Sequence, residues 1–520
     1  MTDAIQQIQK NYDDCPYYSF PYHHSAPEHL AAVAYAFGLS APDVRTARVL
    51  ELGCAAGGNL IPFAVRNPRA RAVGIDLSST QVQDGCRRIE RLQLGNVELL
   101  QKDLMSVTKT FGQFDYILCH GVYSWVPEAV QQAILNICRE NLSADGVAYI
   151  GYKTYPGWKA HEIVRDAMLL RAHAQDDAHT RLAHGRGMLD FLHKHALRNS
   201  VLARAVEQDQ ETVQTYDAAY VIHDFLSPNN APCYFKDFAA RAESHGLAYL
   251  ADAEPPLMFA TNYGDEIARL LFSECGHSQV LLEQYLDFVS DRSFRRSLLV
   301  HKERAGDISY QMQHTRLREL HVAAQLECAD GEVRIDDSPQ RFGASNGSVV
   351  VFDTPVAKLA ADALARAWPF TLGFEELHRM VQTSLPVSAE AGNDTEGQLV
   401  AFFNAIVVQG MGRYRVAPYV RQAENPCVEQ SARDYPADLP QGQAVHTFNG
   451  WHEPVQLDPV AQYLLPHIDG SRTREALLAL LKQAVTQGTL AIPRKASAVD
   501  ALDDQVLAAD LDRVLALLCA

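Results

Sequence analysis

Short apolar runs recur along the first third of the chain at nearly constant spacing, and the gaps between them are long enough for helices. The runs that we expect to form strands are 48–52, 72–76, 97–100, 116–119 and 147–152. Helix-length stretches at 82–92 and 127–141 fill two of the gaps. Strands that alternate with crossover helices favour a parallel sheet with helices on both faces. The pattern therefore predicts an α/β fold over residues 46–152.

A helix is expected before the first strand. Ser25 and Glu28 have the spacing of a capping box, and Pro27 suits the first turn of a helix. Apolar residues follow at three- and four-residue intervals up to Phe37, and Gly38 is a suitable C-terminal stop.

After the fifth strand the pattern becomes mainly helical. Residues 158–215 have helical spacing, and a helix followed by a strand is expected at 235–250 as the late part of the same sheet. Residues 160–225 would then be in part an insertion that covers the active site.

The last third begins with a turn-rich stretch at 330–348. Three helical segments and a short strand follow: the first helix begins at 354–355, and the others are expected near 374–381, 399–409 and 412–416. This order is typical of a winged helix. Two more helices are expected at 457–485, so a second, degenerate winged helix stays an open alternative.

The chain is acidic, with 46 Lys and Arg against 63 Asp and Glu and a net charge of −17. This argues against DNA or RNA as the main partner, because phosphate binding needs clustered cations. From residue 346 onward, the chain has 13 Lys and Arg and 20 Asp and Glu. We therefore expect the winged-helix region to serve protein recognition or dimerisation.

The ten cysteines are scattered without a CxxC pair, which is typical of reduced thiols and offers no metal-ligand spacing. The N-terminal residues lack the apolar core of a signal peptide, and no apolar run approaches the roughly 18 residues of a membrane span. We expect a cytoplasmic protein without a metal or a membrane span.

The first strand runs into a glycine-rich turn, Glu51-Leu-Gly53-Cys-Ala55-Ala-Gly57-Gly58-Asn59. Such a turn lets the backbone approach a ligand where a side chain would collide. It also loosely matches the dinucleotide fingerprint, so this turn alone leaves NAD open. Glu51, however, would place a negative charge beside a pyrophosphate, whereas a ligand with an amine and a sulfonium benefits from that charge.

Carboxylates also follow the next two strands. Asp76 lies where a carboxylate can hold ribose hydroxyls, and Asp103 lies where one can accept from an adenine amine. Three acidic strand ends favour S-adenosylmethionine over NAD. The cofactor contacts that we assign are Glu51, Gly53, Ala55, Gly57, Asn59, Asp76, Leu77, Asp103, Leu104 and His120. Taken alone, Gly57 is as well explained by helix packing, and Asp103 by capping a helix.

The turn also matches the first motif of class I methyltransferases, E/D-x-G-x-G-x-G, with alanine at the middle position. Longer segments are NYDDCPY at 11–17, HGVYSWVP at 120–127, YKTYPGW at 152–158, YVIHDFL at 220–226 and FRRSLLVH at 294–301. With these, the chain resembles bacterial methyltransferases that carry a methyltransferase regulatory domain, and in particular rickettsial-type protein-lysine methyltransferases with a C-terminal winged-helix domain. The resemblance implies a Rossmann-like, mostly parallel seven-stranded sheet, S-adenosylmethionine as cofactor and a protein lysine as methyl acceptor.

Methyl transfer is an in-line displacement, so the enzyme must mainly align the reactants and exclude water. A lysine amine must react in its neutral form, which burial among aromatic rings favours. The candidates for this role are Tyr123, Trp125, Tyr155 and Trp158, with His120 as a proton acceptor and Tyr12 and Tyr17 as a lid. Plain packing is the alternative for each aromatic residue.

Other polar residues are expected to be structural. We predict that His223 has no catalytic part, and that Arg295 and Arg296 lie on a solvated face or in a salt bridge. Nucleic-acid amine methyltransferases carry an Asn/Asp-Pro-Pro-aromatic motif after the fourth strand, where this chain has Cys-His-Gly-Val. Its absence counts against a base as acceptor.

The domain boundaries that we infer are 1–45 for an N-terminal arm and helix, 46–215 for the cofactor-binding domain, 216–305 for a regulatory region that completes the sheet, 306–345 for a linker and 346–520 for the winged-helix-like region. Two other functions stay open: methylation of a small molecule, and a regulator that binds the cofactor without turnover.

Overall fold

The computed structural model describes residues 9–518 apart from 11, 174–176, 345–346, 387–393, 422, 439–444 and 491–503. Asn11 and Cys519, which the sequence patterns above include, lie outside the described residues.

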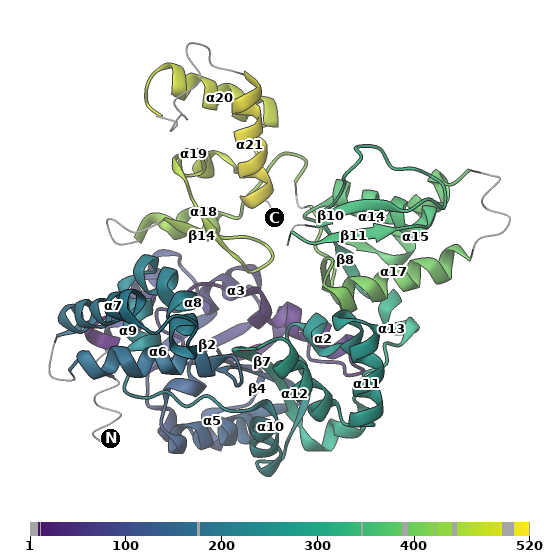
Figure 1. The fold of residues 1–520 in the computed structure, drawn as a ribbon. Helices are drawn as coiled ribbons and strands as arrows, with labels where there is room; N and C mark the ends of the chain where they lie inside the picture. The colour runs from purple at the N-terminus through teal and green to yellow at the C-terminus, as the bar shows by residue number, and fades with distance from the viewer. Residues whose placement is uncertain are drawn as a thin grey trace.

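A seven-stranded sheet forms the centre of the N-terminal part of the molecule (Figure 1). The strands are β1 (Arg48–Leu52), β2 (Arg71–Asp76), β3 (Val97–Gln101), β4 (Phe114–Cys119), β5 (Leu142–Lys153), β6 (Leu247–Asp252) and β7 (Phe294–His301). They lie in the order β3-β2-β1-β4-β5-β7-β6, and β7 runs antiparallel to both neighbours. The predicted Rossmann-like, mostly parallel sheet is confirmed.

Two strands begin two or more residues before their apolar runs. β4 begins two residues earlier than expected because Arg48 neutralises Asp115 at 2.9 Å, which lets a carboxylate lie inside a strand. β5 begins at Leu142, and Ser143 on that extension donates to the same carboxylate at 2.9 Å. A charged residue therefore hides part of the strand signal.

Helices cover both faces of this sheet. One face packs against α2 (Pro27–Ala36), α3 (Leu60–Arg66) and α4 (Ser79–Arg91), and the other against α5 (Glu128–Asn141) and α10 (Phe235–Ser244). The helix α2 begins at Pro27 as predicted, but the capping box does not form. Ala26 is the N-cap, and the Ser25 hydroxyl instead lies 3.1 Å from Asn59 Oδ1.

The predicted helical insertion is present. It consists of α6 (Trp158–Arg171), α7 (Ala178–His195), α8 (Val201–Thr215) and α9 (Ala218–Phe225), which share one apolar core. Two further helices, α11 (Asp265–Cys275) and α12 (Gln279–Val289), precede β7.

The Arg295 guanidinium on β7 is fully buried, so the solvated-face alternative is wrong and the salt-bridge alternative is right. It contacts the carboxylates of Glu283 at 2.9 Å and Asp287 at 2.8 Å, both on α12. Arg296 pairs with Glu254. These ion pairs tie α12 and the residues after β6 to the sheet.

The stretch 306–345 is not a plain linker. It contains α13 (His314–Arg318), β8 (His321–Ala323), β9 (Leu326–Cys328) and β10 (Gln340–Ala344). β10 pairs with β9 and with β11 (Val349–Phe352), and β8 lies between β12 (Leu372–Gly373) and β13 (Arg413–Arg415). Strands this short show too few alternations to be recognised from their pattern. They join α14 (Pro355–Ala367), α15 (Phe374–Ser384) and α17 (Thr395–Gln409), the three helices expected there.

The C-terminal part, drawn in yellow-green to yellow in Figure 1, forms a lobe above α3. It contains α18 (Gln430–Asp434), a hairpin of β14 (His446–Phe448) and β15 (Pro454–Gln456), α19 (Pro459–Leu464), α20 (Arg474–Thr486) and α21 (Asp504–Leu518). Within the described ranges, no helix combines the length and apolar character needed to cross a bilayer.

Candidate active site

A cavity of about 390 Å³ opens at the carboxyl ends of β1, β2 and β4. Carboxyl ends of parallel strands meet at one edge of a sheet, which is where ligands of such folds bind. Twelve of the sixteen predicted site residues line this cavity: Tyr12, Tyr17, Glu51, Gly53, Ala55, Asn59, Asp76, Leu77, Asp103, Leu104, His120 and Trp125.

The glycine-rich turn needs its small residues for steric reasons. Gly53 has a φ of +74°, and a Cβ there would lie 2.4 Å from a Val122 methyl. A Cβ on Gly58 would collide with the backbone of Ser19, because the N-terminal arm crosses the turn at that point. Ala55 takes a φ of +48°, and its N–H donates to Asp76 at 2.8 Å. The turn is therefore held open toward the cavity.

Glu51 is a buried carboxyl with one free oxygen. Asn59 donates to Oε1 at 2.9 Å, whereas Oε2 is buried without a hydrogen-bond partner among the described residues. Burial raises the pKa of this carboxyl to about 8, against the opposing effect of the Asn59 hydrogen bond. An unpartnered carboxylate oxygen facing a cavity fits a ligand that carries an ammonium group, as S-adenosylmethionine does.

Asp76 retains the capacity to hold hydroxyl groups. Its two oxygens each accept one backbone N–H, from Ala55 at 2.8 Å and from Ser78 at 2.9 Å, and a carboxylate can accept about four hydrogen bonds. Burial raises its pKa, and the backbone donors oppose that shift. Asp103 accepts from Met105 N–H at 2.9 Å, so it caps a short helical turn and also lines the cavity.

The N-terminal arm lies over the cavity. Tyr12 stacks on His223 with ring centroids 4.3 Å apart, and His223 Nε2 lies 2.7 Å from the Cys15 carbonyl oxygen. Asp13 accepts from the Ser78 hydroxyl at 2.7 Å, which fixes the arm beside β2. His223 therefore holds the arm through these contacts, and it is also part of the cavity wall.

Lys153 and Asp224, which the sequence analysis did not select, form an ion pair of 2.8 Å inside the cavity. The Lys153 ammonium lies 4.0 Å from the ring centroid of Trp158. The rings of Trp125 and Phe294 are 5.8 Å and 5.7 Å away. An alkylammonium group therefore already occupies a cage of three aromatic rings and one carboxylate.

Four predicted residues do not line the cavity. A Cβ on Gly57 would lie 3.0 Å from Leu99 and 3.2 Å from Ile61, in agreement with its helix-packing alternative. Tyr123 is fully buried in the core against Phe238 on the far face of the sheet, because the short helical turn at Tyr123–Trp125 directs successive side chains to opposite sides.

Tyr155 and Trp158 lie just outside. The Tyr155 hydroxyl donates to Glu162 at 2.6 Å, and its ring faces Tyr234 rather than the cavity. The Trp158 ring packs against the Lys153 ammonium. Neither side chain is among the residues that line the cavity.

His120 lies at the centre of the site but is a poor proton acceptor there. Its Nδ1 lies 2.7 Å from the Tyr149 hydroxyl, and the Tyr22 ring is 4.0 Å away. Burial, with the nearby Arg296 and Lys153, lowers its pKa to about 3. His120 is therefore neutral at physiological pH and suited to ligand contact.

Several lining residues were missed by the sequence analysis: Ser19, Tyr22, Lys153, Tyr220, Asp224, Phe294 and Arg296. Tyr220 and Asp224 are four residues apart, which places them on one face of α9. That spacing could have identified this pair. Phe294 and Arg296 come from the antiparallel strand β7, whose place beside β5 is not visible in the local pattern.

Comparisons with known proteins agree with this architecture. Family models match at residues 50–148 (methyltransferase domain), 217–301 (predicted methyltransferase regulatory domain) and 424–520 (PKMT, C-terminal winged helix domain). The winged helix thus corresponds to the stretch that was left open as a second copy, rather than to the whole of 346–520.

The uncharacterized protein RP789 of Rickettsia prowazekii is 30% identical over 502 residues, which cover 94% of this chain and 88% of that protein. RP028 of the same organism is 34% identical over 235 residues, 45% of this chain and 94% of that protein. Among solved structures, PKMT2 from Rickettsia typhi in complex with AdoHcy has a TM-score of 0.81 and 26% identity, covering 96% of this chain and 97% of that one.

The acidic strand ends, the glycine-rich turn and these relationships lead to one conclusion. The chain belongs to the S-adenosylmethionine-dependent methyltransferases that combine a class I catalytic fold with a methyltransferase regulatory domain and a C-terminal winged-helix domain of the PKMT type.

Proposed function

We propose that this enzyme methylates the side-chain amine of a lysine in a protein substrate. The observation that carries the proposal is the cage around Lys153, where Asp224 and three aromatic rings hold an alkylammonium group inside the cofactor cavity. The similarity to the rickettsial PKMT2 structure supports the same acceptor class.

The cofactor contacts are proposed as follows. Glu51 Oε2 binds the ammonium group, Asp76 accepts from the ribose hydroxyls, and Asp103 with Leu104 borders the adenine. S-adenosylmethionine, when bound, supplies a methyl group that its sulfonium already activates. Tyr12 and Tyr17 cover this end of the cavity and exclude water, which strengthens the electrostatic contacts below them.

The acceptor lysine would enter the cage and displace Lys153 from Asp224. Lys153 has a long, flexible side chain, so its ammonium can leave without movement of the backbone. Asp224 then receives the proton that the incoming amine must lose before it attacks, while Trp125 aligns the amine by contact with its ring.

The direct test combines methyl-labelled S-adenosylmethionine, host lysate and the purified enzyme, with the label located by gel and mass spectrometry. Label on lysines of a protein band is the expected result. The isosteric Asp224→Asn variant should bind S-adenosylhomocysteine normally and lose most transfer. Equal turnover by Asp224→Asn and the native enzyme would contradict the assigned proton acceptor.

A second candidate is methylation of an anionic small molecule. Lys153 and Arg296 both line the cavity and could hold an acidic group. The two candidates predict opposite effects of Lys153→Met. Removing the internal ammonium lowers KM for a lysine substrate, because a competitor is gone, but raises KM for an anionic acceptor. Label found only in a protein-free extract would favour this alternative.

The third candidate is a regulator without turnover, and it predicts tight cofactor binding with no transferred label in either fraction. For the C-terminal part, we propose that it selects the protein partner. Its acidic balance favours protein recognition over DNA.

A further inference from the structure

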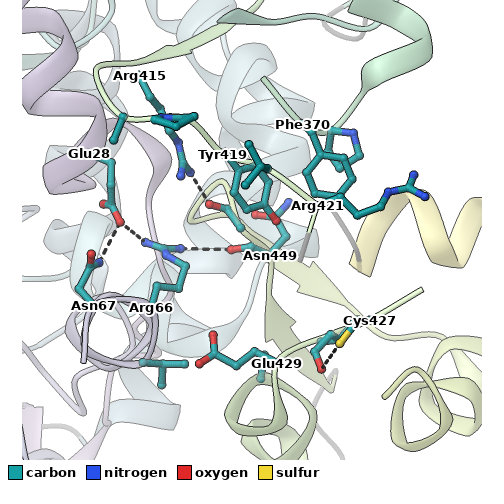
Figure 2. A pocket seen from close by; sticks show the side chains of 18 of the residues that line it. Glu28, Arg66, Asn67, Phe370, Arg415, Tyr419, Arg421, Cys427, Glu429 and Asn449 are labelled. Carbon is teal, nitrogen blue, oxygen red and sulfur yellow. Dashed lines mark hydrogen bonds and ion pairs between the residues drawn. The ribbon is translucent and has the colours of Figure 1, made fainter. Parts of the chain in front are cut away.

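A hairpin of the C-terminal part reaches into the methyltransferase domain. β14 and β15 are joined by residues Asn449 to Glu453, and the tip of this hairpin meets the carboxyl end of α3. Figure 2 shows Arg66 of α3 between Glu28 and the Asn449 backbone, with distances of 3.4 Å and 3.2 Å. A cavity of about 1460 Å³ borders this contact. The tip is therefore a point of attachment beside an open space.

Trp451 anchors the tip. Its ring is 1% exposed, it stacks on Trp368 at 6.2 Å, and its Nε1 donates to the Pro369 carbonyl at 3.0 Å. Its own carbonyl lies 2.9 Å from His23 Nδ1 in the N-terminal segment. Two regions distant in sequence, residues 368–369 and the N-terminal segment, thus hold one turn in place.

His452 follows Trp451, and its side chain points toward the glycine-rich turn. Its Nδ1 lies 2.8 Å from the Arg66 guanidinium and its Nε2 lies 2.8 Å from Asn59 Oδ1. A guanidinium can only donate, so Nδ1 must be the acceptor and Nε2 must carry the hydrogen. His452 therefore donates to Asn59. Burial and Arg66 lower the His452 pKa well below its usual value, so this neutral form persists.

Asn59 connects His452 to Glu51 through hydrogen bonds at both ends of its side-chain amide. Its Oδ1 accepts from His452 Nε2 and from the Tyr22 N–H at 3.1 Å, and it also lies 3.1 Å from the Ser25 hydroxyl. With Oδ1 held on this side, the Asn59 amide nitrogen is directed to Glu51 Oε1 at 2.9 Å. Glu51 Oε2 is the free oxygen described above. A continuous chain of hydrogen bonds therefore runs from a residue of the C-terminal part to the wall of the cofactor cavity.

We propose that His452 is a positioning residue for the cofactor: through Asn59 it holds Glu51 in the orientation that binds the cofactor's amino group. The inference rests on the proposed placement of that group at Glu51. Its consequence is reciprocal coupling, because a contact that favours cofactor binding is itself favoured by the bound cofactor. Docking of the C-terminal part and loading of the cofactor then depend on each other.

The test compares two ligands by isothermal titration calorimetry of the full-length enzyme. S-adenosylhomocysteine carries the amino acid group, and 5′-methylthioadenosine lacks it. His452→Leu should weaken binding of S-adenosylhomocysteine by about tenfold, which is the effect of losing one buried hydrogen bond, here the one from His452 to Asn59. The affinity for 5′-methylthioadenosine should stay within about twofold of the native value. His452→Gln, which retains a donor and an acceptor, should recover most of the loss.

Glu51→Gln is the matched control. It should lose affinity for S-adenosylhomocysteine alone, which places the amino group at Glu51 independently of His452. Equal losses for both ligands in Glu51→Gln would overturn the cofactor placement. Selective loss in Glu51→Gln with none in His452→Leu would overturn only the positioning role.

A measurement on the unaltered enzyme covers the case in which His452→Leu does not fold. S-adenosylhomocysteine should slow amide hydrogen exchange in residues 446–456, and 5′-methylthioadenosine should slow it much less. Equal rates of amide hydrogen exchange in the hairpin with either ligand bound would refute the coupling.

Discussion

Cofactor binding should release a proton from Glu51. With a pKa of about 8 in the empty cavity, this carboxyl is about 90% protonated at pH 7. A bound ammonium favours the ionised form and lowers that pKa. If the pKa in the complex falls below 6, binding at pH 7 releases about 0.8 to 0.9 proton.

The sign of the pH effect follows from the same shift. Only the ionised carboxylate pairs with the ammonium, so affinity rises with pH until the pKa of about 8 is reached. The ionised fraction increases about ninefold between pH 6 and pH 7, and S-adenosylhomocysteine should bind up to about ninefold more tightly over that range. Below pH 6 the dependence continues only down to the pKa of the complex.

Titration calorimetry in two buffers of different ionisation enthalpy measures the released proton. The native enzyme should show a heat that depends on the buffer at pH 7, and Glu51→Gln should show much less dependence. The two proteins should approach the same affinity only below the pKa of the complex, where the native carboxyl stays neutral with the ligand bound and resembles an amide. A native enzyme whose binding heat is independent of the buffer would refute the reasoning.

Three further changes test other parts of the structure. Asp76→Ala should weaken S-adenosylhomocysteine by about 100-fold or more in a calorimetric titration, because the ribose loses a charged acceptor, and unchanged affinity would contradict the site as described. Trp125→Ala should raise KM for the acceptor severalfold while the cofactor Kd stays constant, and a parallel loss of both would place Trp125 against the cofactor instead. Arg295→Met should lower the free energy of unfolding by about 3 to 5 kcal/mol in denaturant titrations, because Glu283 and Asp287 remain buried without their cation.

The strands that carry the cofactor residues could be predicted because each is a short apolar run with a turn at its end. Glu51, Asp76 and Asp103 were found from their positions at those ends, and all three line the cavity. This part of the site is local in sequence. Its geometry follows from the parallel sheet, which brings successive strand ends to one edge.

The acceptor side was harder because its residues come from separate elements. Lys153 ends β5, Asp224 lies on α9 and Phe294 begins β7, and only the tertiary fold brings them together. Tyr123 was assigned to the site but does not line the cavity. An aromatic residue after a strand looks like a site residue, but the two-residue offset within one short helical turn separates Trp125 in the cavity wall from Tyr123 in the core. His452 lies 393 residues from Asn59, so no sequence pattern could connect them.

The position of β7 limits how this enzyme can be divided. β5 is twelve residues long and lies between β4 and β7, so any fragment that stops before Phe294 exposes the side of β5 that β7 pairs, along Ala148 to Lys153. Unpaired N–H and C=O groups along an apolar strand are a template for association with other chains. During synthesis, the first five strands must await the sixth and seventh, made about a hundred residues or more later, before that side is covered. The boundary between a catalytic and a regulatory domain is therefore a division of sequence families, whereas the smallest unit that pairs β5 on both sides extends through both.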